Sequence, residues 1–375
     1  MKIPKTLLTV NSFILFTFIA PITYMLWRFV NFSRSISSFF QSWNVFGLMF
    51  NTISVFFAVV FTSVLVGLLI SIVTVRFEFK GSKILFTLCV LPLVIPSYIG
   101  ALTYISAFSP KGLFVQIFNR YGIEEIAGIE GFLGSWLVLT LFTYPYVQLI
   151  CSSALRNLDS TVEDAARSLG VNQFKVYTSV VIPRLKKPII YSSLLVGLYV
   201  ISDFGAVSLM RYSTVTKAIY AYYELSILSD PVIFYSSLLI VLALLISFIQ
   251  RGSATSRSAK VSGTPRIPKK VRLERNGKVL VYSFLGGIIF LGLIIPVAVL
   301  GFWLFRGLYY GTDLTSSIPG ILGSFSASIV TSILAIVISM PIVILISQYK
   351  SRFGDILEKI MLSLFRPLPT IFYPL

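Results

Sequence analysis

The chain has 375 residues, of which 56% are hydrophobic and only 12% are charged, and its net charge is +17. Soluble globular proteins carry about 25% charged residues, so this composition excludes an ordinary soluble domain and predicts an all-α polytopic membrane protein. The chain has no histidine, the commonest metal ligand and general base, and no GxxxxGK[ST] phosphate loop. We therefore expect a chain that is not an enzyme and has no catalytic residue, metal site or cofactor of its own.

Hydropathy predicts about nine membrane-spanning helices, because a bilayer core needs about 20 mainly apolar residues per helix. The first of them follows Lys2 and Lys5 and has no small-x-small cleavage site after it, so we expect a retained anchor and not a signal peptide. The predicted spans are 7–27, 48–75, 84–107, 133–153, 188–209, 232–249, 280–305, 324–347 and 357–375.

Most of the 31 Lys and Arg residues fall in loops on one side of this topology, together with the N-terminus. The positive-inside rule then predicts a multi-pass membrane protein with a cytoplasmic N-terminus. The net charge reflects this topology, and we expect contact with the lipid bilayer but none with nucleic acid. Cys89 and Cys151 fall within or at the end of spans and are predicted to be apolar packing residues.

Two spans with prolines or an acid are candidates for a translocation path. A carboxylate inside a span costs about 2.5–3.5 kcal/mol on insertion scales, so Asp203 could line such a path, beside Phe204 and Gly205, and meet a cation. Alternatively, it caps a helix interrupted near Gly205 or pairs with a polar group of a neighbouring span. Pro92 and Pro96 lie in the middle of the span 84–107 and could mark an interrupted helix around a cavity.

The polar loop at 159–187 carries signals for a helix, a turn and a second helix. Ser160 and Glu163 have the spacing of a capping box, in which the Glu163 carboxylate reaches back to the Ser160 amide. Gly170 can close the first helix in the left-handed conformation, Asn172 can cap the second, and Pro183 marks its far end.

A loop that only reconnects two spans needs no such caps. We therefore predict that loop 159–187 docks on a partner protein. The alternative is an amphipathic helix that lies on lipid headgroups, helped by Arg184, Lys186 and Lys187.

The beginning of the chain is repeated near its end. Gly81 matches Gly354 and Pro96 matches Pro369, both 273 residues apart, within a common order of long span, short basic loop and proline-containing span. Parallel repeats of this kind occur in transporters, although channels and scaffolds can repeat too. The second copy stops at Leu375, so we expect a full repeat to need about 150 further residues.

The repeat divides the chain into three predicted parts. Residues 1–250 form a first lobe of about six spans, and residues 280–375 form the start of a second lobe with about three. Between them, residues 251–279 are rich in Ser, Gly, Pro and basic residues and have no apolar period, which predicts a flexible cytoplasmic linker. Its basic residues could instead bind anionic lipid headgroups.

The run EDAARSLGVNQFKVYTSVVIP resembles the EAA loop of ABC importer permeases, with an aspartate in place of the usual glutamate. The matching positions are Asp164 (or its neighbour Glu163), Ala165, Ala166, Gly170, Val180, Ile182 and Pro183. The resemblance implies a type I ABC importer transmembrane fold in the plasma membrane, the inner membrane of a bacterium. It also implies that the loop is a coupling helix pair that docks on separate ATPase subunits, two in number, which bind ATP and Mg.

The run ISDFGAVSLMRYSTVTKAIYAYYE is similar to the segment after the EAA loop in permeases of the ferric iron type, in which two halves are fused in one chain. This implies import of ferric iron delivered by a periplasmic or lipid-anchored solute-binding protein. Thiamine, polyamine and phosphonate-related permeases share parts of the pattern. A remnant that binds the ATPase without transport, and a secondary transporter or channel, are the remaining alternatives.

Overall fold

The computed structural model describes a helical protein. The described residues are 4–31, 44–109, 112–119, 128–158, 163, 166, 168–225, 230–254, 270–311, 313 and 315–349. Within them, five helices are long and apolar enough to cross a membrane, or seven if each of two bent helix pairs counts as one span. The prediction of an all-α polytopic membrane protein is therefore confirmed. The last predicted span, 357–375, lies outside the described residues.

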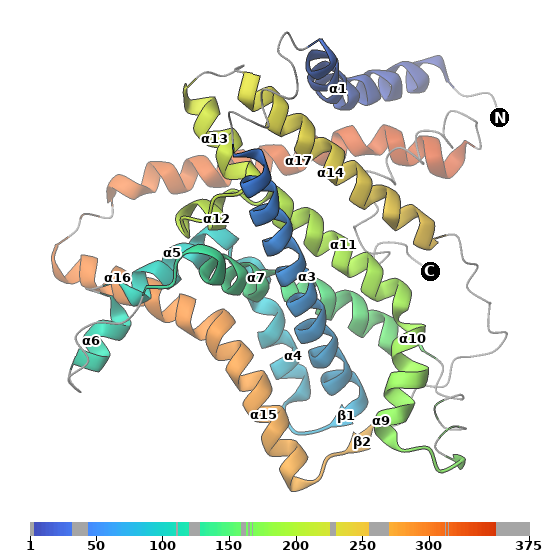
Figure 1. The fold of residues 1–375 in the computed structure, drawn as a ribbon, viewed down its shortest axis with the longest axis vertical. Helices are drawn as coiled ribbons and strands as arrows, with labels where there is room; N and C mark the ends of the chain where they lie inside the picture. Colours follow the sequence, from blue (N-terminus) through green and yellow to red (C-terminus); the bar gives the residue numbers. More distant parts are fainter. Residues whose placement is uncertain are drawn as a thin grey trace. The chain divides into compact units, whose positions relative to one another are not determined.

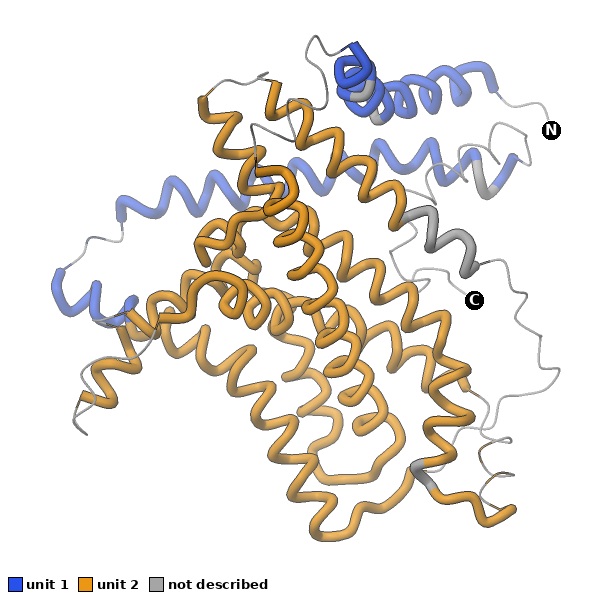
Figure 2. The backbone as a smooth tube through the Cα atoms, viewed as in Figure 1, with its two compact units in different colours: residues 1–34, 303–366 blue, residues 35–302, 367–375 orange. Residues whose placement is uncertain are grey.

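By their contacts the residues form two compact units (Figure 2). Unit 1 comprises residues 1–34 and 303–366, and unit 2 comprises residues 35–302 and 367–375. In unit 1, helix α1 (Lys5–Val30) packs against α17 (Ile318–Gln348), which follows the short turn η4 (Thr315–Ser317). The buried Asn11 side chain donates a hydrogen bond of 3.2 Å to the Pro341 carbonyl between these two helices. The division into lobes at 1–250 and 280–375 stays a prediction.

The core of unit 2 is the close pair of α3 (Val45–Arg76) and α7 (Gly131–Arg156), with α11 (Lys186–Ser202) packed on both (Figure 1). Small and hydroxyl-bearing residues line the contact. The Ser63 and Thr143 hydroxyls lie 2.9 Å apart, and a Cβ built on Gly67 would meet Val147 Cβ at 2.6 Å. Small residues let membrane helices approach closely, and this gain in packing replaces the hydrophobic effect that lipid does not supply.

The predicted span 84–107 is not one continuous helix, because the chain bends inside it. Helix α4 (Ser82–Val90) tightens into the 3₁₀ turn η1 (Leu91–Val94), and α5 (Ser97–Phe108) leaves at a bend of 95°. Pro96 has no amide hydrogen and holds Ile95 in an extended conformation, with ψ at 118°. Pro96 therefore interrupts the helix, which is the role predicted for it from the sequence. Helix α6 (Leu113–Asn119) packs on α5.

The predicted span 188–209 also breaks. Helix α11 ends at Ser202, and the short α12 (Gly205–Leu209) starts anew. The remaining elements of this part are α13 (Val215–Leu225) and α14 (Asp230–Ala254), which pack on each other. The predicted span 232–249 lies within α14.

The predicted linker 251–279 is ordered at both described ends. Helix α14 continues to Ala254, strand β2 (Val271–Arg272) pairs in parallel with β1 (Phe77–Glu78), and α15 (Arg275–Ile289) begins before residue 279. Residues 255–269 lie outside the described part. Helix α15 runs through the π-helical turn η3 (Phe290–Ile294) into α16 (Ile295–Tyr309).

We expect Gly67→Leu to lower the free energy of unfolding by about 1–3 kcal/mol, because the new side chain must force α3 away from α7. Thermal unfolding of the purified protein in detergent measures this loss. Gly286→Leu on α15 is the matched control, since a Cβ built there meets nothing within 4 Å. Equal unfolding temperatures for the two variants would contradict the packing described for α3 and α7.

Candidate functional site

The loop between α7 and α11 contains the turn that the sequence predicted. Gly170 has φ at +78°, in the left-handed region, and the Val171 amide donates a hydrogen bond of 3.2 Å to the Ala166 carbonyl. This bond from five residues further along the chain is typical of a Schellman motif, which satisfies the carbonyls at a helix end. The predicted helix end at Gly170 is confirmed. Ser160, Asp164 and Ala165 lie outside the described residues.

The second helical stretch of the loop begins after Asn172, whose backbone carbonyl accepts from the Val176 amide at 3.0 Å. It consists of α9 (Gln173–Val176), the π-helical turn η2 (Tyr177–Val181) and α10 (Ile182–Arg184), and it meets α11 at a bend of 61°. Pro183 lies one residue before its end, close to the predicted limit. The π-helical turn η2 comes just before Pro183, and η3 comes just before Pro296. Such a wide turn relieves the clash between a proline ring and the preceding turn of the helix.

The loop is anchored by a buried row of side chains that the sequence analysis missed. Tyr177, Val181 and Leu185 recur every fourth residue and pack with Val75 of α3 and Leu155 of α7. This spacing of four is the signal that could have found the row, because it marks one face of a helix. The motif's aliphatic residues, Val180 and Ile182, flank the fully buried Val181 and are themselves only half-buried.

An ion pair holds the first helix of the loop, of which residues 163, 166 and 168 are described. Arg76 Nη2, at the end of α3, lies 2.7 Å from Glu163 Oε1, and both side chains are only 2% exposed. Arg76 was given no role from the sequence, and the predicted capping box of Glu163 stays a prediction, because Ser160 lies outside the described residues. Glu163 is therefore turned toward α3 and away from the surface, and Asp164, the other candidate acid of the motif, lies outside the described residues. The neighbouring turn is exposed instead, with Leu169 at 83%.

The two helix breaks of unit 2 meet at Asp203. Its carboxylate accepts hydrogen bonds from the Ser97 hydroxyl of α5 and, at 2.9 Å, from the Ala206 amide of α12. Its backbone carbonyl accepts from the Thr216 hydroxyl of α13 at 2.9 Å. A Cβ on Gly205 would lie 2.6 Å from Tyr98 Cβ, so only glycine permits this approach of α12 to α5.

These contacts support both structural roles weighed for Asp203, since it caps the interrupted helix and also pairs with a polar group of a neighbouring element. The Phe204 ring lies 4.3 Å, between centroids, from the ring of Tyr220. Pro96 precedes Ser97 and so belongs to the same place, whereas Pro92 faces Gly292 of η3. Among the described residues, no three His, Cys, Asp or Glu side chains converge to hold a metal ion.

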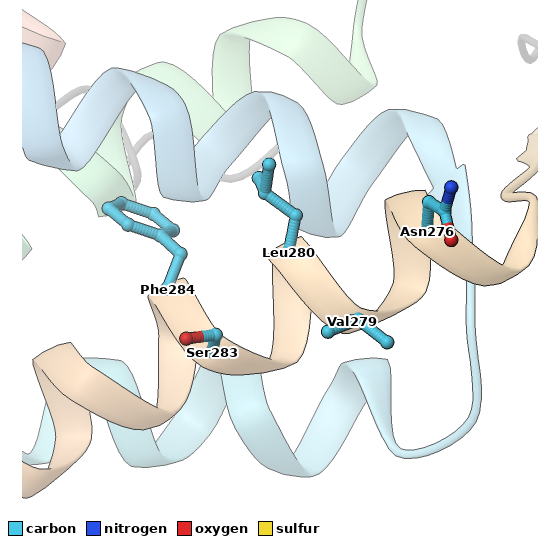
Figure 3. Close-up of a pocket in the computed structure, with 5 residues that line it drawn as sticks. All are labelled: Asn276, Val279, Leu280, Ser283 and Phe284. Carbon is cyan, nitrogen blue, oxygen red and sulfur yellow. The ribbon is translucent and has the colours of Figure 1, made fainter.

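A groove of about 560 Å³ opens along the first turns of α15 (Figure 3). Its lining residues all come from this one helix: Asn276, Val279, Leu280, Ser283 and Phe284. Sites for small molecules enclose most of the ligand surface, which the side of a single helix does not do. We therefore do not assign the groove to a transported solute.

Comparisons with known proteins place the chain among transport proteins. Residues 63–256 match the family described as binding-protein-dependent transport system inner membrane component. The chain is 27% identical over 328 residues to the Fe(3+)-transport system permease protein FbpB 2 of Haemophilus influenzae, covering 86% of this chain and 61% of the relative. It is 28% identical over 155 residues to the sulfate transport system permease protein CysT of Salmonella typhimurium, covering 41% of this chain and 54% of that protein.

A solved structure of an amino acid ABC transporter with histidines matches 59% of this chain and all of that chain, with a TM-score of 0.43 and 19% identity. The chain thus spans about three fifths of the length of the iron-transport relative and about half of the sulfate relative.

The helices define a polytopic helical membrane protein, and between α7 and α11 it has a polar loop whose described residues include a glycine turn and a second helical stretch. The family match covers more than half of the chain, from within α3 to the end of α14. The chain belongs to the family of binding-protein-dependent transport system inner membrane components.

We expect Asp203→Ala to lower the free energy of unfolding by about 1–2 kcal/mol, because it removes the cap of α12 and the tie to Ser97. Asparagine caps helices nearly as well, so Asp203→Asn should unfold within a few tenths of a kcal/mol of the wild type. Thermal unfolding in detergent compares the two variants. If alanine and asparagine proved equally harmless, the carboxylate would not have the capping role described here.

Proposed function

We propose that this chain is the permease subunit of an ATP-driven importer for ferric iron, with substrate delivered by a solute-binding protein outside the membrane. The observation that carries the iron assignment is the extent of the match. The iron-transport relative covers 86% of this chain, so the similarity continues beyond the family region at 63–256. The sulfate relative covers 41%.

Import of sulfate is the second candidate, since several sulfate permeases match the chain at 24–29% identity. The charge at the helix breaks argues against it. If Asp203 lines the path with Phe204, Gly205, Pro92 and Pro96, its carboxylate attracts a cation and repels a dianion such as sulfate. Thiamine, polyamine and phosphonate permeases remain weaker candidates, because they rest on the sequence resemblance alone.

In this proposal, the loop at 159–187 is the surface on which ATPase subunits dock in the cytoplasm, and the N-terminus lies on the same side. The turn at Gly170 and the exposed Leu169 support this assignment, because they place an exposed apolar side chain next to a helical stretch that is packed on α3 and α7. A surface helix on lipid headgroups needs no fixed angle between two helices.

The mechanism follows from two conformations of the permease. ATP can act only by binding better to an assembly in one conformation than in the other. Closure of the ATPase subunits would displace the loop, open the permease outward and admit the substrate, and hydrolysis would return it inward. The breaks at Pro96 and Asp203 are places where short helices can turn relative to one another, since no continuous helix crosses them.

The test begins with purification of the tagged full-length chain from its own membranes. We expect an ATP-binding subunit to co-purify with it. Proteoliposomes that hold this complex and the solute-binding protein should take up radiolabelled ferric iron only with ATP, and much more of it than radiolabelled sulfate. Uptake without ATP would indicate a secondary transporter or channel. A bound ATPase without uptake of either solute would indicate a non-transporting remnant.

We expect Gly170→Val to abolish uptake while the protein still inserts in the membrane. A β-branched residue cannot adopt φ at +78° without strain of about 1–2 kcal/mol or more, although a Cβ there meets nothing within 4 Å. The variant therefore deforms the turn and leaves the packing intact. Gly170→Asn is the matched control, because asparagine tolerates this conformation and should retain most uptake. Normal uptake by the valine variant at normal expression would refute the coupling role of this turn.

A further inference from the structure

The end of α3 holds a charged pair where apolar packing would be expected. Arg76 and Glu163 are 87 residues apart in the sequence, yet their side chains meet at 2.7 Å. Both are 2% exposed, so water does not surround either charge. One partner ends a helix of 32 residues that is long and apolar enough to span the membrane, and the other belongs to the loop after α7.

Such a pair is a weak source of stability. Removing two charges from water costs about as much as their attraction returns, and apolar residues of similar volume often stabilise a protein equally well. A buried ion pair does, however, fix one relative position of two elements, because its hydrogen-bonding geometry is directional. At this site, the two elements are the end of α3 and the first helix of the loop.

The next residue of α3 extends the connection. The Phe77 ring lies 6.1 Å, between centroids, from the ring of Tyr177, which belongs to the second helical stretch of the loop. The Phe77 backbone pairs with Val271 of β2, just before α15. Both parts of the loop are thus tied to one short stretch of chain at the end of α3.

We propose that Arg76 and Glu163 are positioning residues for energy coupling, a role that rests on the proposed function. The ion pair holds the first helix of the loop on the end of α3. A push on the exposed tip at Leu169 then moves α3, and with it the packed α7, instead of deforming the loop alone. Glu163 acts through Arg76 and does not itself touch the ATPase, because it is buried.

The decisive variant is the double replacement Arg76→Met and Glu163→Leu, which removes both charges and roughly keeps their volumes. We expect the complex to retain its ATPase at the wild-type level and to hydrolyse ATP, while uptake per ATP hydrolysed falls by about ten-fold or more. Glu163→Gln alone leaves Arg76 charged and buried and is expected to reduce insertion as well. Arg76→Lys keeps a charged pair with Glu163. This variant should therefore retain part of the uptake that the double variant loses.

The matched control is Glu78→Gln. Glu78 lies two residues from Arg76 and pairs with Arg272 at 3.4 Å, but these side chains are 58% and 90% exposed. Exposed pairs contribute little, so this variant should couple normally.

Three results distinguish the possibilities. Wild-type uptake per ATP in the double variant would overturn the positioning role and leave the proposed function intact. Loss of bound ATPase in proportion to lost uptake would also overturn it, because the pair would then support docking and not transmission. A wild-type protein that neither retains an ATPase nor transports would contradict the proposed function itself.

Discussion

The hydrocarbon core of a membrane offers no water to satisfy backbone amides and carbonyls, so each break in a helix must be satisfied by the protein. Unit 2 has such breaks at Pro96 and at Asp203, and they face each other. The Asp203 carboxylate accepts from Ser97 and from the start of α12, and its backbone carbonyl accepts from Thr216. The carboxylate thus satisfies a backbone amide at the start of α12, and its bond from the Ser97 hydroxyl ties this break to the one at Pro96, an approach that Gly205 allows.

The same helices extend to the ordered loop. Helix α3 packs along α7 through small residues, and its final residue, Arg76, holds the first helix of the loop. The row of Tyr177, Val181 and Leu185 holds the second stretch on the ends of α3 and α7. The described part of the loop is therefore joined to the spanning helices at two places, which is the arrangement that a protein needs if a force applied at Gly170 is to act within the membrane.

Local signals in the sequence predicted local structure well. Gly170 adopts the left-handed conformation that its position between two helical segments required, and the high apolar content gave the helical membrane class. The expectation of one continuous helix at 84–107 and another at 188–209 was wrong, because hydropathy sums apolar content and does not detect where a helix bends or ends. The Arg76–Glu163 pair joins positions 87 residues apart, so no local pattern could reveal it.

The most direct test of this account is photocrosslinking from position 169 in the intact membrane. Leu169 is 83% exposed at the tip of the loop, and Leu225, at the end of α13, is 82% exposed and predicted to lie on the opposite side of the membrane. A photoreactive amino acid at 169 should crosslink to an ATP-binding subunit, and the same group at 225 should not. A crosslink to lipid alone at 169, or to the ATP-binding subunit from 225, would contradict the coupling role of the loop.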